Sequence, residues 1–196
     1  KLLEHIIIMD ENQQVLNYAE NKINSQEFIF NKDYQRALLE LINSRKKCEI
    51  SAIAPNFELA DNYGAAQNLR KHKGKFVVLY FGATWCSPCI EELRDIENYI
   101  DNFDTTEIKF YFIFLENNNK EKWLKFIESR NKRISYLYSE GGFKSQIAQN
   151  YFIKALPRTF IIDQDGKILF GRYGAVSEAE INVTMEIQKI KEILRK

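Results

Sequence analysis

Residues 76–89 read FVVLYFGATWCSPC, and no other stretch says more about the architecture of this chain. The run 76–81 is apolar and rich in valine and aromatic residues, which is typical of a buried parallel strand. Pro88 suits the first turn of a helix, because its missing N–H needs no partner there. The pattern predicts a strand, a tight turn, Cys86 and then a helix.

This arrangement gives the two cysteines different chemistry. Cys86 would lie at the positive end of a helix dipole, beside backbone N–H groups without partners, and both favour the nucleophilic thiolate over the thiol. Cys89 follows about one helical turn later, close enough to attack a mixed disulfide on Cys86. The motif therefore predicts a redox-active dithiol, in which Cys86 is exposed and of low pKa and Cys89 is buried.

Other uses of a cysteine pair fit the sequence poorly. A structural zinc site needs four ligands, whereas the remaining candidates, Cys48, His5 and His72, have no ligand-like spacing. A haem attachment site needs a histidine directly after the second cysteine, and that residue is Ile90. We expect the chemistry to need neither a metal nor an organic cofactor. We interpret Cys48 as a plain thiol, with a regulatory disulfide as the alternative.

Length and composition bound the class of protein. A chain of 196 residues can hold one domain and an appendage, and its hydrophobic content of 45% is that of a globular protein. The net charge of +1 gives no reason to expect nucleic acid or an anionic membrane as a partner. Residues 2–9 are apolar but too short and interrupted for a signal-peptide core. Because the chain begins with lysine, we expect that an upstream segment, with any targeting signal, has been removed.

Hydrophobic spacing divides the chain in two. Residues 1–50 have helical periodicity and contain neither proline nor glycine, which predicts a helical N-terminal extension with Asp33 as one helix cap. Residues 51–196 alternate strands and helices, which predicts a mixed α/β sheet flanked by helices, with the cysteine motif at the C-terminal edge of a central strand. In order, we expect an edge strand 55–61, a strand 76–81, a helix 87–100, a strand 108–115, a helix 120–129, a strand 135–138, a helix 142–151, a hairpin of 156–163 with 167–172, and a terminal helix 177–196 capped by Ser177 and Glu180.

Four short motifs run through the second part of the chain: 54–57 (APNF), 82–89 (GATWCSPC), 156–163 (LPRTFIID) and 165–167 (DGK). Together they resemble the TlpA/ResA-like thiol-disulfide oxidoreductases of the thioredoxin fold, over roughly residues 51–196. An additional helix around Trp123 is also a feature of this subgroup. The resemblance implies a thioredoxin-like domain that exchanges disulfides without a cofactor.

The resemblance also implies a role for each residue of the motifs. Cys86 would attack the substrate disulfide, and Cys89 would resolve the mixed disulfide. Pro157 would be the cis-proline that faces the dithiol. Leu156 would offer its backbone to an extended substrate strand, and Trp85 would pack beside the dithiol and shield it.

One position departs from thioredoxin, which has a buried aspartate six residues before the first cysteine. That position is Tyr80 here, which cannot act as a carboxylate base. TlpA/ResA-like proteins carry a glutamate three residues after the second cysteine, which is Glu92 here. Residues i and i+3 share a helix face, so Glu92 would lie near Cys89 and move a proton or raise the thiol pKa. We interpret Glu91 and Arg158 as surface charges.

The sequence favours a reductase of protein disulfides. Ser87 and Pro88 resemble the Gly-Pro and Glu-Pro of reducing members, with no histidine that would stabilise the Cys86 thiolate further and make a strong oxidant. Since TlpA/ResA-like proteins are exported, the resemblance implies a periplasmic or otherwise extracytoplasmic location. There a membrane electron donor would restore the dithiol.

Three alternatives stay open. A thiol peroxidase of the same fold would place its cysteine in a Pro-x-x-x-Thr-x-x-Cys frame, which Thr84 does not fit. A copper-binding assembly protein of this fold would use a Cys-x-x-x-Cys pair and a distal histidine, and the spacing here is shorter by one. A non-catalytic interaction module would carry the dithiol without using it, and activity on a disulfide separates that case.

Overall fold

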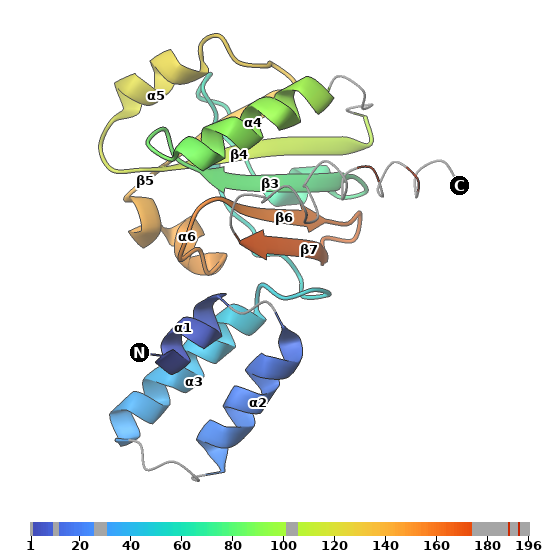
Figure 1. Cartoon of the computed structure of the whole chain (residues 1–196). Helices are drawn as coiled ribbons and strands as arrows, with labels where there is room; N and C mark the ends of the chain where they lie inside the picture. Colours follow the sequence, from blue (N-terminus) through green and yellow to red (C-terminus); the bar gives the residue numbers. More distant parts are fainter. Residues whose placement is uncertain are drawn as a thin grey trace.

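The fold is seen in a computed structural model, which describes residues 2–9, 12–25, 31–100 and 106–173, together with 188 and 192. Five strands form one sheet in the order β5-β4-β3-β6-β7, with β3 in the middle (Figure 1). β3, β4 and β5 are parallel, whereas β6 runs antiparallel to β3 and β7 antiparallel to β6. This confirms the mixed sheet expected from the sequence. The strand bounds are Phe76–Gly82 (β3), Ile108–Glu116 (β4), Ile134–Glu140 (β5), Arg158–Ile162 (β6) and Ile168–Tyr173 (β7).

Helices cover both faces of the sheet, because the central strands are buried on both sides. All seven residues of β3 are buried. Helices α4 (Ser87–Ile100) and α5 (Lys120–Ile127) pack on one face through Leu93, Ile96 and Trp123. Helix α6 (Gln146–Asn150) packs on the other face, together with Tyr151 and Phe152. The cysteine motif therefore stands between a central strand and the helix that follows it.

The N-terminal extension forms three helices, α1 (Leu2–Met9), α2 (Gln13–Asn24) and α3 (Lys32–Lys46), which lie beyond α6 and β7, away from α4 and α5 (Figure 1). They have an apolar core of their own. The expected cap Asp33 is wrong: Asn31 caps α3, two residues earlier than the sequence suggested, and its side chain accepts the Asp33 N–H at 2.8 Å. The buried residues of this small core are Ile7, Leu16, Ile23, Leu38 and Ile42.

Two other expected elements are shorter than predicted. The edge strand 55–61 is only β1 (Leu59–Ala60), paired with β2 (Ala66–Gln67), because the Asp61 carboxylate accepts two backbone N–H groups and closes a turn. The helix 142–151 is split into a 3₁₀ turn, η2 (Gly142–Lys144), and α6, since Ser145 is extended and caps the second piece. Another 3₁₀ turn, η1 (Leu69–His72), precedes β3.

The terminal helix 177–196, with its cap at Ser177 and Glu180, lies outside the described residues. Within the described ranges, none of the helices combines the length and apolar character that crossing a bilayer requires.

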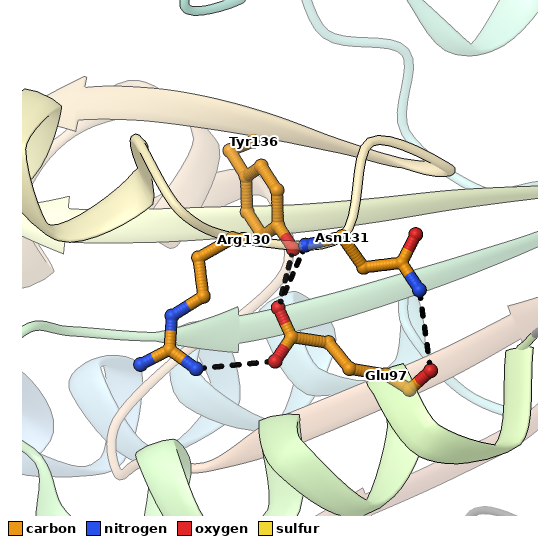
Figure 2. Close-up of polar contacts among 4 residues, drawn as sticks. All are labelled: Glu97, Arg130, Asn131 and Tyr136. Atoms are coloured by element: carbon orange, nitrogen blue, oxygen red, sulfur yellow. Dashed lines mark hydrogen bonds and ion pairs between the residues drawn. The ribbon is translucent and has the colours of Figure 1, made fainter.

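Helix α4 is tied to β5 and to the segment before it by one carboxylate. Glu97 accepts hydrogen bonds from the Tyr136 hydroxyl at 2.7 Å and the Asn131 N–H at 3.3 Å, and pairs with Arg130 at 3.1 Å (Figure 2). The Asn131 side chain also donates to the Glu97 carbonyl. Burial raises the pKa of Tyr136, and the hydrogen bond to Glu97 adds to this shift, so the phenol remains a donor. These contacts fix the helix that begins directly after Cys86 and carries Cys89 in its first turn.

Candidate active site

Cys86 and Cys89 form a disulfide at the start of α4, and Cys86 comes four residues after the end of β3. The Cys86 carbonyl accepts the Ile90 N–H at 3.1 Å, which begins the helix. The Cys89 N–H points at Cys86 Sγ, 3.3 Å away. Cys86 thus holds the N-cap position, where a side chain meets the free N–H groups of the first turn. In the reduced protein the same groups would stabilise a Cys86 thiolate.

The two cysteine residues differ little in exposure. Cys89 is 0% exposed, as expected, but Cys86 is only 7% exposed, so the expectation of an exposed Cys86 is wrong for the disulfide form. A disulfide draws Cys86 Sγ against its buried partner, which a sequence pattern does not reveal. Cys86 is still the more accessible of the two, and thiol exchange needs access to one sulfur only.

The close approach of β3 to the disulfide explains Gly82, the last residue of the strand. A Cβ atom there would lie 2.6 Å from Cζ of Phe112 and 3.1 Å from Cβ of Cys89. Any other residue would have to displace the Phe112 ring and would crowd Cys89. This glycine allows the disulfide to sit directly on the sheet.

Glu92 lies inside the protein. Its side chain is 5% exposed, and its Oε2 accepts a hydrogen bond from the Tyr80 hydroxyl at 2.8 Å. Tyr80 comes from β3 and Glu92 from α4, so the contact joins the strand to the helix beneath the dithiol. Glu91 is exposed, as expected. The two neighbouring glutamates therefore have opposite environments.

The residues assigned to substrate binding lie on two segments, the loop before Cys86 and the loop before β6. Trp85 is 55% exposed, and its ring centroid lies 6.4 Å from that of Phe143 in η2. The peptide bond between Leu156 and Pro157 is cis, and Pro157 is buried. Leu156 is partly buried and packs against the cores on both faces of the sheet.

Sequence reasoning missed two residues here and misjudged a third. Tyr80 has no role in the sequence-based prediction because it is not a carboxylate. In the structure its hydroxyl donates a hydrogen bond to the Glu92 carboxylate. Glu116, at the end of β4, is 3% exposed and accepts the Thr84 N–H at 2.6 Å, which holds the loop before Cys86. Arg158 is not a surface charge: it is 7% exposed, with its guanidinium 4.5 Å from the ring centroid of Phe160. The alternation of β6 directs its side chain inward.

Cys48 lies on the opposite face of the sheet from the disulfide. It is buried in the core on the α6 face, where its thiol donates to the Asn150 carbonyl at 3.2 Å. Burial raises its pKa to about 12, against a smaller opposite effect of Arg158. The thiolate is therefore scarce at neutral pH, which agrees with a plain thiol.

Comparisons with known proteins agree with this geometry. Residues 50–170 match the AhpC/TSA family. The chain is 30% identical over 128 residues to the thiol-disulfide oxidoreductase ResA of Bacillus cereus, covering 65% of this chain and 71% of that protein. It is 29% identical over 136 residues to ResA of Bacillus subtilis, covering 69% and 74%.

Solved structures support the fold. The thioredoxin domain of a thiol-disulfide oxidoreductase from Bacteroides vulgatus superposes with a TM-score of 0.61 at 20% identity, covering 74% of this chain and 96% of that one. A thiol-disulfide oxidoreductase from Bacteroides fragilis gives 0.57 at 22% identity, covering 71% and 98%.

A thioredoxin-like sheet with a vicinal cysteine pair at the start of its central helix defines a thiol-disulfide oxidoreductase, an enzyme that acts on disulfide-bearing proteins. The matches to known proteins also identify the family. The chain belongs to the AhpC/TSA family, and within it to the TlpA/ResA-like proteins of the thioredoxin fold.

Proposed function

We propose that this oxidoreductase works as a reductase of protein disulfides. Cys86 attacks the substrate disulfide as a thiolate, and one substrate sulfur leaves as a thiolate. Cys89 then attacks Cys86 Sγ, which releases the second substrate sulfur and leaves the Cys86–Cys89 disulfide. The observation that carries these roles is the hydrogen bond from the Cys89 N–H to Cys86 Sγ at the start of α4. This hydrogen bond supports Cys86 as the cysteine whose thiolate the helix stabilises.

Glu92 takes the proton that Cys89 must lose before it attacks. A buried carboxylate three residues after a buried thiol, on the same helix face, is a suitable base. Trp85, Leu156 and Pro157 bind the substrate, with the Leu156 backbone pairing with an extended segment beside the disulfide. Leu156 is suited to this by its place between the two cores.

The reductase requires a source of electrons, because each turnover leaves the dithiol oxidised. We place the protein in a periplasmic or otherwise extracytoplasmic space, with a membrane electron donor. We also divide the chain into a helical extension, 1–50, and a thioredoxin-like domain, 51–196. The separate core of the three N-terminal helices supports this division, and so does the family match that begins at residue 50.

The reduction potential of the Cys86–Cys89 pair tests the direction. Equilibration with glutathione or dithiothreitol buffers should give a value near that of thioredoxin, roughly −270 mV, and the protein should reduce insulin. A value near −120 mV, with faster oxidation of a dithiol peptide than reduction of insulin, would show an oxidase instead. Cys86→Ser should abolish reduction, whereas Cys89→Ser should accumulate the mixed disulfide. Faster turnover of hydrogen peroxide than of insulin would favour the peroxidase.

A further inference from the structure

The hydroxyl of Tyr80 needs an explanation that packing does not supply. Tyr80 is 2% exposed on the apolar α4 face of the sheet, and its ring packs on Phe112 with centroids 4.7 Å apart. Phenylalanine would fill this space equally well. The hydroxyl oxygen lies 2.8 Å from Glu92 Oε2 and 3.4 Å from the Cys89 carbonyl oxygen. The polar atom of Tyr80 is thus directed at the helix turn that contains the resolving cysteine.

Such a donor changes what a buried carboxylate can do. Burial disfavours the charged form of Glu92, and a hydrogen bond donated to the carboxylate favours it. The phenol also fixes where Oε2 lies, since the Tyr80 ring is itself held by β3 and Phe112. Because the carboxylate is planar and rigid, this contact also fixes the position of Glu92 Oε1.

We propose that Tyr80 is a positioning residue for the resolving step, acting through Glu92. This inference rests on the proposed role of Glu92 as the base. In that step the Cys89 thiol gives its proton to the Glu92 carboxylate, and its sulfur forms a bond with Cys86 Sγ. The bond between Cys86 Sγ and the substrate sulfur breaks, and the substrate sulfur leaves with the electron pair as a thiolate. The Tyr80 hydroxyl keeps Glu92 ionised and aimed during this transfer.

Among the described residues, titratable groups around this contact come from four elements. Tyr80 comes from β3, and Cys86, Cys89 and Glu92 come from α4. Glu116, from β4, is bound to the loop before Cys86. Arg158, from β6, lies with Phe160 in the layer on the opposite face of the sheet.

Stopped-flow reaction of the reduced protein with the aromatic disulfide DTNB separates the two steps. The first equivalent of thionitrobenzoate reports attack by Cys86, and the second reports resolution by Cys89. In Tyr80→Phe the first phase should be unchanged. The pH profile of the second phase should move up by about one pH unit, because a hydrogen bond to the charged form is lost. On the acid limb of that profile the second phase should slow about tenfold.

A second tyrosine–glutamate contact on α4 provides a matched control. The Tyr136 hydroxyl donates to the Glu97 carboxylate at 2.7 Å, the same kind of contact, five residues further from the dithiol (Figure 2). Tyr136→Phe should leave both phases unchanged. If Tyr80→Phe does not fold, a ring-fluorinated tyrosine at position 80 serves instead. It is a stronger donor and should move the second-phase profile down.

The variants separate the two ideas. If Glu92→Gln leaves the second phase unchanged, the proposed role of Glu92 is wrong, and this inference falls with it. If Glu92→Gln slows the second phase but Tyr80→Phe does not, only the role of Tyr80 is wrong. In the double variant, Tyr80→Phe should add nothing to Glu92→Gln. A further slowing there would mean that Tyr80 does not act through Glu92.

Discussion

Replacing Glu97 by alanine tests whether one carboxylate fixes α4 to the sheet. The change leaves the Tyr136 hydroxyl, the Asn131 N–H and the Arg130 guanidinium without their acceptor. Hydrogen bonds to a charged group contribute about 1.5–3 kcal/mol each, and breaking a buried ion pair costs about 3–5 kcal/mol in all. The Glu97 and Arg130 side chains are 13% and 17% exposed, so water can replace part of the loss. We expect the free energy of unfolding to fall by about 3 kcal/mol.

Urea unfolding followed by far-ultraviolet circular dichroism measures this change, and the melting temperature should fall by about 6–12 °C for a chain of this size. Glu91→Ala is the control, because Glu91 is an exposed glutamate on the same helix, and it should cost less than about 0.5 kcal/mol. A loss below about 1 kcal/mol for Glu97→Ala would refute the idea that these contacts anchor the helix.

Three further outcomes follow from the same structure. Iodoacetamide at near-neutral pH should label Cys86 of the reduced protein before Cys89, and mass spectrometry that finds Cys89 labelled first would reverse their roles. Cys48 should stay unlabelled in the native protein because burial raises its pKa to about 12, and Cys48→Ser should keep full insulin reduction. Burial, with help from Lys109, lowers the pKa of His72 to about 4, so the unfolded chain binds a proton here first as pH falls from 6.5. Stability should therefore drop by about 1 kcal/mol between pH 6.5 and 4, a modest figure because the ring is partly exposed, and His72→Gln should reduce that drop in pH-dependent urea titrations.

Sequence patterns predicted the parts of this protein that depend on long apolar runs. β3 and β4 are buried on both faces, so their hydrophobic signal is continuous, and the helix after Cys86 followed from Pro88. Contacts between layers were not predictable in the same way. The bond between Tyr80 and Glu92 depends on which face of β3 meets α4, and a uniformly buried strand has no alternation that would reveal it. The short β1 depends on the two hydrogen bonds of Asp61, which a local pattern suggests only as a turn.

Leu156 packs against the hydrophobic cores on both faces of the sheet. This packing affects how fast and how tightly a client, meaning a protein substrate, could bind. Binding a flexible loop to an extended peptide normally consumes entropy on both sides. Under the proposed pairing with Leu156, this segment of the protein has little freedom left to lose, so the ordering cost falls almost wholly on the incoming chain. A client that is already unfolded around its disulfide loses as much entropy on binding as any other client. It does not, however, have to unfold locally before it binds. Selection among clients would then reflect how readily each one opens, more than which side chains it carries.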